Sequence, residues 1–177
     1  MERLPLDSTR WPFAALAASF FMLAAARFFQ HVMHLAPCPL CYNQRQAYWV
    51  AAALALVALF MRRRGSGSRL LFAFNLLTGV AFLAGAGVAL YHSLVEWGIA
   101  PAPDTCAAGA AQVPEDILGA LSRPIAVPSC SEPLWDLFGI TMANYNFAIA
   151  LGLATLTFIA AGRQHKTPDT ENELPAE

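Results

Sequence analysis

The chain has few charged residues. Asp, Glu, Lys and Arg make up only 13% of its 177 residues, against about 25% in a typical soluble domain. Hydrophobic residues make up 57%, and the mean hydropathy is +0.47. The composition therefore argues against a soluble domain and predicts an integral membrane protein. The net charge of −1 gives no overall positive field that would attract nucleic acid.

Two other signals are scarce. The first apolar segment continues into residues 28–31, Phe-Phe-Gln-His, where a cleavage site would need small residues, so no cleavable signal peptide is expected. Cysteine occurs four times, as Cys38, Cys41, Cys106 and Cys130. An even number permits two disulfides, provided that the compartment is oxidising.

Four apolar segments are long enough to cross a bilayer, which takes about 20 residues. They run from about Trp11 to His31, Tyr42 to Met61, Leu70 to Tyr91 and Met142 to Ala161. We expect an all-α membrane protein with a four-helix bundle over residues 1–162. Gly79, Gly85 and Gly87 in the third segment suit close helix packing.

Basic residues predict the orientation of these segments. The strongest cluster lies between the second and third segments and contains Arg62, Arg63, Arg64 and Arg69. The positive-inside rule places this loop in the cytoplasm. Both termini would then be cytoplasmic, and all four cysteines would lie on the outer side. In a bacterium that side is the oxidising periplasm, where dithiols become disulfides.

The polar segments are a long loop and a tail. The outer loop, residues 92–141, contains several prolines and is long for a bare connection. Pro114 at a first helical position, followed by Glu115 and Asp116, predicts a short surface helix within it. The tail, residues 163–177, is polar and is predicted to be a disordered cytoplasmic segment.

Cys38 and Cys41 form a C-x-x-C at the edge of the second segment. Neither a second C-x-x-C nor a histidine at position 42 is present, so this motif supports neither a four-ligand zinc site nor covalent haem attachment. A redox dithiol is the best interpretation, because a helix start favours the Cys41 thiolate and Arg45, one turn further, adds a positive charge. The alternative for Arg45 is an interfacial residue whose head group reaches water.

Two strings carry a family resemblance. Residues 28–45, FFQHVMHLAPCPLCYNQR, and residues 130–142, CSEPLWDLFGITM, resemble the DsbB family, the disulfide bond formation protein B of bacterial inner membranes. The resemblance covers roughly Phe28 to Tyr145 and includes the four-span topology. It implies an enzyme, a thiol:quinone oxidoreductase. Such an enzyme reoxidises a periplasmic DsbA-like thiol oxidant and passes the electrons to a membrane quinone, ubiquinone or menaquinone.

The resemblance also implies a division of labour among the cysteines. Cys106 and Cys130 would form the disulfide that faces the soluble partner, whose thiolate attacks Cys106. Cys130 would then attack Cys38 of the Cys38–Cys41 disulfide. Cys41, beside Arg45, would donate to the quinone.

Further polar residues have weaker assignments. His92 occupies about the place of a family histidine near the quinone, although an interfacial polar role is equally compatible with the sequence. Trp135 matches the position of a family tryptophan, and a redox role and an interfacial aromatic anchor are both open there. We expect His31 and His34 to be interface residues rather than metal ligands. Gln44 stands where the family often has Glu, which removes one charge near the thiols.

Other classes of protein remain open at this point. A quinone-linked reductase of the vitamin K epoxide reductase type shares the bundle and the C-x-x-C, but there the motif is expected late in the chain. A membrane metal- or haem-binding protein would use the cysteines with His31, His34 and His92. A non-catalytic membrane scaffold would hold two structural disulfides.

Overall fold

The computed structural model describes residues 10–65, 67–107 and 129–165. Four long helices dominate it: α1 (Trp11–His31), α2 (Pro39–Arg63), α3 (Ser68–Glu96) and α6 (Met142–His165). Each is long and apolar enough to cross a membrane. The predicted all-α membrane protein with four spanning helices is confirmed. The predicted surface helix after Pro114 lies outside the described residues, as do residues 166–177 of the predicted tail.

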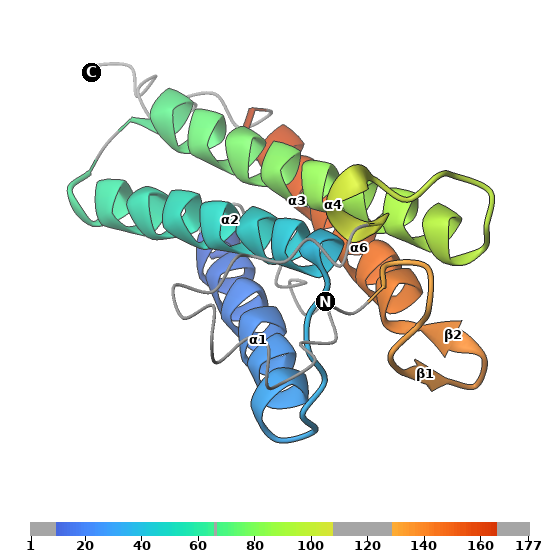
Figure 1. Cartoon of the computed structure of the whole chain (residues 1–177). Coiled ribbons are helices and arrows are strands. Elements are labelled where there is room, and N and C mark those ends of the chain that lie inside the picture. Colours follow the sequence, from blue (N-terminus) through green and yellow to red (C-terminus); the bar gives the residue numbers. More distant parts are fainter. Residues whose placement is uncertain (1–9, 66, 108–128, 166–177) are drawn as a thin grey trace, which may run out of the picture.

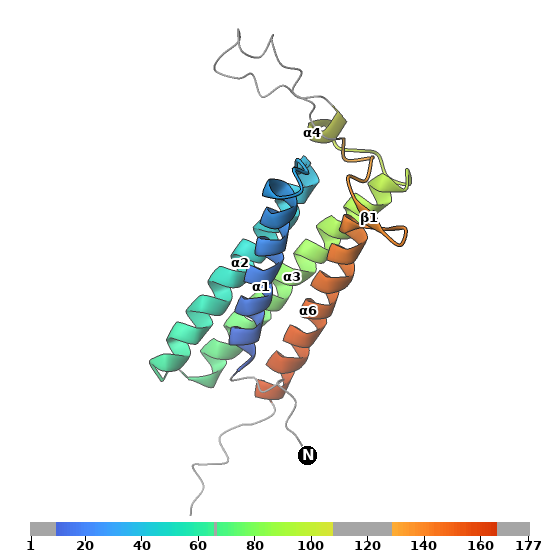
Figure 2. The ribbon, with the colours of Figure 1, turned by 90° about the horizontal axis from the view of Figure 1, so that it is seen from below.

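The helices run alternately up and down in one bundle (Figure 2). Helix α3 packs along both α2 and α6, while α1 packs mainly on α2. At the start of α1, the Trp11 indole donates a hydrogen bond of 3.0 Å to Thr157 Oγ1 and so connects α1 to α6. Three helices extend beyond the predicted segments, since α2 begins at Pro39, α3 continues to Glu96 and α6 reaches His165.

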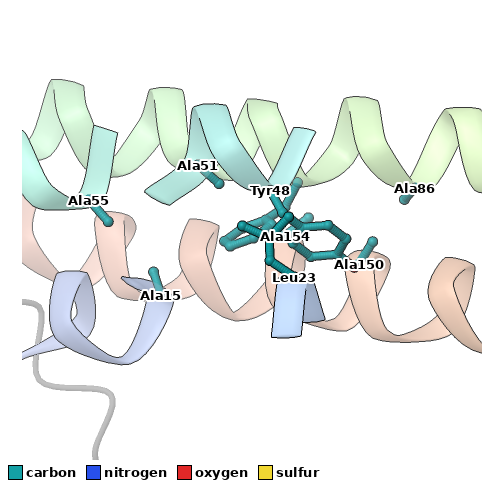
Figure 3. Packing of buried hydrophobic residues seen from close by; sticks show 9 residues of the cluster. Ala15, Leu23, Tyr48, Ala51, Ala55, Ala86, Ala150 and Ala154 are labelled. Atoms are coloured by element: carbon teal, nitrogen blue, oxygen red, sulfur yellow. The ribbon is translucent and has the colours of Figure 1, made fainter. Parts of the chain in front are cut away.

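Small side chains fill the centre of the bundle (Figure 3). Leu23, Tyr48 and Phe82 are the only large residues in the main buried cluster of the described chain. The rest are alanines from all four helices: Ala15, Ala51, Ala55, Ala86, Ala150 and Ala154. Small interface residues let helix backbones approach closely, which is the usual way to stabilise helix pairs in lipid.

The glycines of α3 differ in their surroundings. A Cβ added at Gly79 would lie 2.7 Å from the Phe158 ring, and one at Gly85 would lie 2.8 Å from Ala47 Cβ. A Cβ at Gly87 would meet nothing within 4 Å. The prediction of close packing is therefore confirmed at Gly79 and Gly85 and is wrong at Gly87.

Two short elements occupy the end of the bundle where α1 meets α2 (Figures 1 and 2). Helix α4 (Asp104–Ala107) carries Cys106 and contacts α2. Strands β1 (Asp136–Leu137) and β2 (Ile140–Thr141) form an antiparallel hairpin directly before α6. This end therefore collects every cysteine of the chain, and we call it the thiol end.

Candidate functional site

The C-x-x-C forms the first turn of α2. Cys38 is the N-cap, and its Sγ accepts a 3.3 Å hydrogen bond from the backbone N–H of Cys41. Pro39 follows at the first helical position, where its missing N–H costs nothing and its fixed φ suits the helix. The helix therefore begins three residues before the predicted Tyr42, and its N-terminal donors serve Cys38 rather than Cys41.

The two thiols are close but unequal. Their Sγ atoms lie 3.0 Å apart, and neither belongs to a disulfide. Hydrogen bonds lower the pKa of Cys38 from 9.0 to about 4, although burial acts in the opposite direction. The bond with Cys41 has the largest effect, and the bond with His92 has a smaller one. Cys38 is thus the thiolate of the pair near neutral pH. Cys38 is buried and Cys41 is partly exposed, and both line the cavity described below.

Cys106 and Cys130 form a disulfide, which is the pairing that the family resemblance implies. Both sulfurs are buried in a small cluster that also contains Cys38, Leu40 and Val95. Helix α4 brings Cys106 to this place, and the segment leading into the hairpin brings Cys130. A disulfide and a dithiol therefore share one buried site, as thiol–disulfide exchange between them requires.

Arg45 is fastened to α1. Its Nη1 donates a 2.6 Å hydrogen bond to Gln30 Oε1, and its Nη2 donates one of 3.2 Å to the Ala26 carbonyl. The guanidinium also lies 5.5 Å from the centre of the Tyr42 ring. Arg45 is one helical turn from Cys41, and both line the same cavity. The site thus has a fixed positive charge on the side of the cavity formed by α1 and α2.

A chain of hydrogen bonds runs through the bundle to the thiols. The Tyr48 hydroxyl donates to Asn146 Oδ1 at 2.6 Å, and Asn146 Nδ2 donates to Gln44 Oε1 at 2.7 Å. Gln44 Nε2 lies 2.9 Å from His92 Nδ1, and His92 Nε2 lies 3.7 Å from Cys38 Sγ. With the amides assigned in this way, Nδ1 accepts from Gln44, so Nε2 carries the proton and directs it toward the Cys38 sulfur.

The nitrogen of His92 that faces Cys38 also faces an acid. Glu96 Oε1 lies 3.7 Å from His92 Nε2, and the Glu96 carboxylate accepts a 2.5 Å hydrogen bond from the Thr141 hydroxyl. Thr141 also accepts a 2.9 Å bond from Asn144 Nδ2. These contacts connect the end of α3 to the hairpin and the start of α6. His92 therefore lies in a buried polar network near the end of α3.

A cavity of about 380 Å³ lies beside the thiols. Its polar lining includes Cys38, Cys41, Gln44, Arg45, His92, Glu96 and Asn146. Most of the remaining lining is apolar and comes from α1, α2, α6 and the hairpin, and it includes Phe21, Met22, Ala25, Phe29, Tyr48, Leu134, Trp135, Met142 and Ile149. A mostly apolar cavity with a few convergent polar groups is typical of a small-molecule site.

Trp135 forms one wall of this cavity. Its ring packs 5.2 Å from that of Phe29 and 6.2 Å from that of Tyr145, measured between ring centres. The wall therefore joins α1, the hairpin and α6.

The other predicted histidines lie elsewhere. His31 Nε2 is 3.5 Å from Arg27 Nη1, and neither His31 nor His34 joins the thiol cluster. Within the described residues, one group has metal-ligand geometry: Cys38, Cys41 and His92, whose ligand atoms lie within 4.8 Å of one another.

The polar network includes three residues that were not predicted as site residues: Tyr48, Glu96 and Asn146. Polar residues inside apolar segments are a signal of a functional site, and this signal could have identified them. Asn146 and Gln44 lie in different helices of the sequence, so their contact is visible only in the folded chain.

The fold and the site together define a four-helix membrane protein that holds a dithiol against a disulfide beside an apolar cavity. Residues 8–160 match the family described as Disulfide bond formation protein DsbB. The chain belongs to this family and is thus a multi-pass membrane oxidoreductase of disulfide bond formation.

Individual relatives agree with this assignment. The chain is 32% identical over 171 residues to Disulfide bond formation protein B of Polaromonas naphthalenivorans, covering 88% of this chain and 93% of the relative. It is 30% identical over 160 residues to the protein of that name from Azoarcus sp., covering 87% and 94%. An uncharacterized protein of Rickettsia prowazekii is 25% identical over 148 residues, with 81% of each chain covered.

Proposed function

We propose that the protein is a thiol:quinone oxidoreductase of the bacterial inner membrane. It oxidises a DsbA-like thiol oxidant of the periplasm through Cys106–Cys130, and it passes the electrons through Cys38–Cys41 to a membrane quinone. One observation carries the proposal: the two cysteine pairs share a buried cluster, and the second pair borders an apolar cavity. The thiol end would face the periplasm, with both termini in the cytoplasm.

The exchange begins at Cys106. The partner's thiolate attacks its sulfur, the bond to Cys130 breaks, and Cys130 leaves as a thiolate. Cys130 attacks Cys38, and the Cys38–Cys41 bond breaks to release Cys41. The partner's second thiol then displaces Cys106, which completes the partner's disulfide.

Cys106 next attacks Cys130, and the bond between Cys130 and Cys38 breaks. This step restores Cys106–Cys130 and leaves two electrons on the inner dithiol. The described arrangement, with Cys106 and Cys130 bonded and Cys38 and Cys41 free, corresponds to this stage. The low pKa of Cys38 supports this last step, because Cys38 is the leaving group and a more acidic thiol leaves faster.

The cavity fits a quinone by its chemistry. Apolar side chains would hold the ring and tail, and the Arg45 guanidinium has further N–H donors for a ring oxygen, while His92 would border the ring beside Cys38. A bound quinone supplies an acceptor for two electrons and two protons. Both thiols line the cavity, and Cys41, the more exposed of the two, would deliver the electrons. Cys38, whose sulfur lies 3.0 Å from that of Cys41, is placed to re-form the disulfide.

The test measures both half-reactions. Purified protein in detergent is mixed with a quinone and a reduced thioredoxin-fold partner, and quinone absorbance and partner thiols are followed together. Cys41→Ser should abolish quinone reduction, and Cys106→Ser should abolish partner oxidation while quinone still binds. Thr105→Ser, at an exposed position next to Cys106, is the matched control and should keep both activities. Full partner oxidation by Cys106→Ser would show that the division of labour is wrong.

A metal-binding protein is the second candidate, supported by the convergence of Cys38, Cys41 and His92. A structural zinc site usually has four ligands, whereas three converge here among the described residues. Metal content measured on the purified protein separates the two functions. A stoichiometric metal together with no partner-dependent quinone reduction would favour this candidate and reject the redox proposal.

A further inference from the structure

The β1–β2 hairpin presents a large aromatic side chain in an unfavourable backbone conformation. The pairs Asp136–Thr141 and Leu137–Ile140 leave a two-residue turn made of Phe138 and Gly139. Both turn residues have positive φ, 55° and 75°. Glycine adopts such angles freely, but a bulky residue rarely does. The Phe138 side chain is 91% exposed, so packing within the described chain does not explain its presence.

Other apolar side chains are exposed at this end of the bundle. Leu137 and Ile140 are exposed on the hairpin, and Trp97 and Ile99 are exposed in the turn after α3. The Thr141–Glu96 hydrogen bond fixes the hairpin to the end of α3, so both groups lie at one level of the bundle.

The position of the hairpin along the chain places this level at the membrane boundary. Strand β2 ends at Thr141, and the apolar spanning helix α6 begins at Met142. Figure 2 shows the hairpin at the side of the bundle, level with the ends of α3 and α6, whereas α4 stands beyond them. Exposed apolar residues continue from this level along both helices, including Leu90, Tyr91 and Leu151.

We propose that the hairpin is a lipid anchor whose tip, Phe138, inserts into the bilayer interface at the thiol end. Large apolar side chains such as Trp, Phe and Leu are stabilised when they are buried at the boundary of head groups and acyl chains. The charged residues near the tip are Glu132 and Asp136, both acidic, and the hairpin has no Lys or Arg. The insertion therefore depends on apolar burial and not on anionic lipid, which attracts basic segments.

The anchor has a consequence for the cavity, which rests on the proposed function. Trp135 and Leu137 line the cavity, and the Tyr145 hydroxyl donates a 3.2 Å hydrogen bond to the Leu137 carbonyl. An inserted Phe138 thus holds the cavity wall against the bilayer, the phase from which a quinone would arrive.

Photo-crosslinking of the full chain tests the anchor. Phe138 is replaced by photoreactive p-benzoylphenylalanine, the protein is reconstituted in phosphatidylcholine vesicles, and lipid adducts are measured by mass spectrometry after illumination. The same probe at Leu151, within α6, is the positive control, and at Thr105, on α4, the negative control. We expect position 138 to give lipid adducts at a yield within about threefold of position 151, and position 105 to give at least tenfold less.

Two comparisons complete the test. Adding anionic lipid should leave the yield at position 138 unchanged within twofold, and a yield that rises with anionic lipid would overturn the proposal. A yield at position 138 as low as at 105 would also overturn it, as would adducts mainly to a soluble thioredoxin-fold partner added to the vesicles. The crosslinking measurement needs no electron transfer. A lack of lipid adducts at position 138 would therefore reject the anchor without affecting the proposed redox function. A lack of redox activity would likewise not affect the anchor.

Discussion

At the level of single residues, the contacts of the Cys38 sulfur decide which thiol of the C-x-x-C loses its proton. The side-chain hydrogen bond with Cys41, then that with His92 and last the Cys41 backbone N–H lower the pKa of Cys38 to about 4, against the opposing effect of burial. In the reduced protein we therefore expect Cys38 to be a thiolate between about pH 5 and about pH 8. This thiolate should be protonated as the pH falls through about 4. Thiolate absorbance at 240 nm during acid titration measures this.

The titration needs a background in which Cys106 and Cys130 are replaced by Ser, so that only the inner pair contributes. Cys38→Ser in that background should remove the thiolate present near neutral pH. A midpoint between about 8 and 9, the range of an ordinary thiol, would contradict the assignment.

Gln44 connects His92 to Asn146 and is 7% exposed. Gln44→Ala leaves two buried polar groups without a partner, which should lower the free energy of unfolding by about 1–3 kcal/mol. It also releases the ring orientation of His92, so the thiolate midpoint of Cys38 should rise. Thermal unfolding in detergent and the absorbance titration measure the two effects. Asn43→Ala, an exposed neighbour, is the matched control, and equal behaviour of the two variants would rule out the network as a positioning device.

At the level of elements, close packing of α3 on α2 should distinguish two glycines two residues apart. Gly85→Ala places a Cβ 2.8 Å from Ala47 Cβ, and this overpacking should cost about 1–3 kcal/mol. Gly87→Ala enters open space and should be neutral or stabilise the helix by up to about 1 kcal/mol. The difference in thermal unfolding between the two variants is the measurement. An equal or reversed order would show that the helices do not approach as described.

The elements also show how far the sequence could predict this protein. Apolar length was sufficient to find the four helices, and the spacing of Cys38 and Cys41 identified the dithiol. The predicted start of α2 was late because the polar run after Cys41 lowers the local hydropathy, although Pro39 suits a first turn. The predicted end of α3 was early because the polar residues His92 and Glu96 find their partners only on other elements.

Two features had no usable signal in the sequence. Strands of two residues, such as Asp136–Leu137, are too short to show an alternating pattern, so the hairpin was not predicted. The contact between Gln44 and Asn146 joins helices that are distant in the chain, and pairing across the bundle cannot be read from periodicity.

At the level of the whole molecule, the two ends of the bundle carry different groups, with the thiols at one end and a basic cluster at the other. Helix α2 has 25 residues, and at 1.5 Å per residue it is about 37 Å long. This exceeds the hydrocarbon core of about 30 Å. Cys38 precedes its first residue, and Arg62 and Arg63 lie in its last turn. A bilayer around the bundle would therefore separate the thiols from the basic cluster, and the positive-inside rule predicts that the basic side is cytoplasmic.

Labelling from one side tests this orientation. Gly67→Cys adds a thiol beside the basic cluster, at a position where a Cβ meets nothing within 4 Å, and it keeps all four arginines. In intact spheroplasts given a membrane-impermeant reductant and maleimide, the peptides of Cys106 and Cys130 should be labelled. The Gly67→Cys peptide should react only after permeabilisation. The reverse pattern would place the exchange site in the cytoplasm, where dithiols stay reduced, and a disulfide-forming direction of electron flow would lose its support.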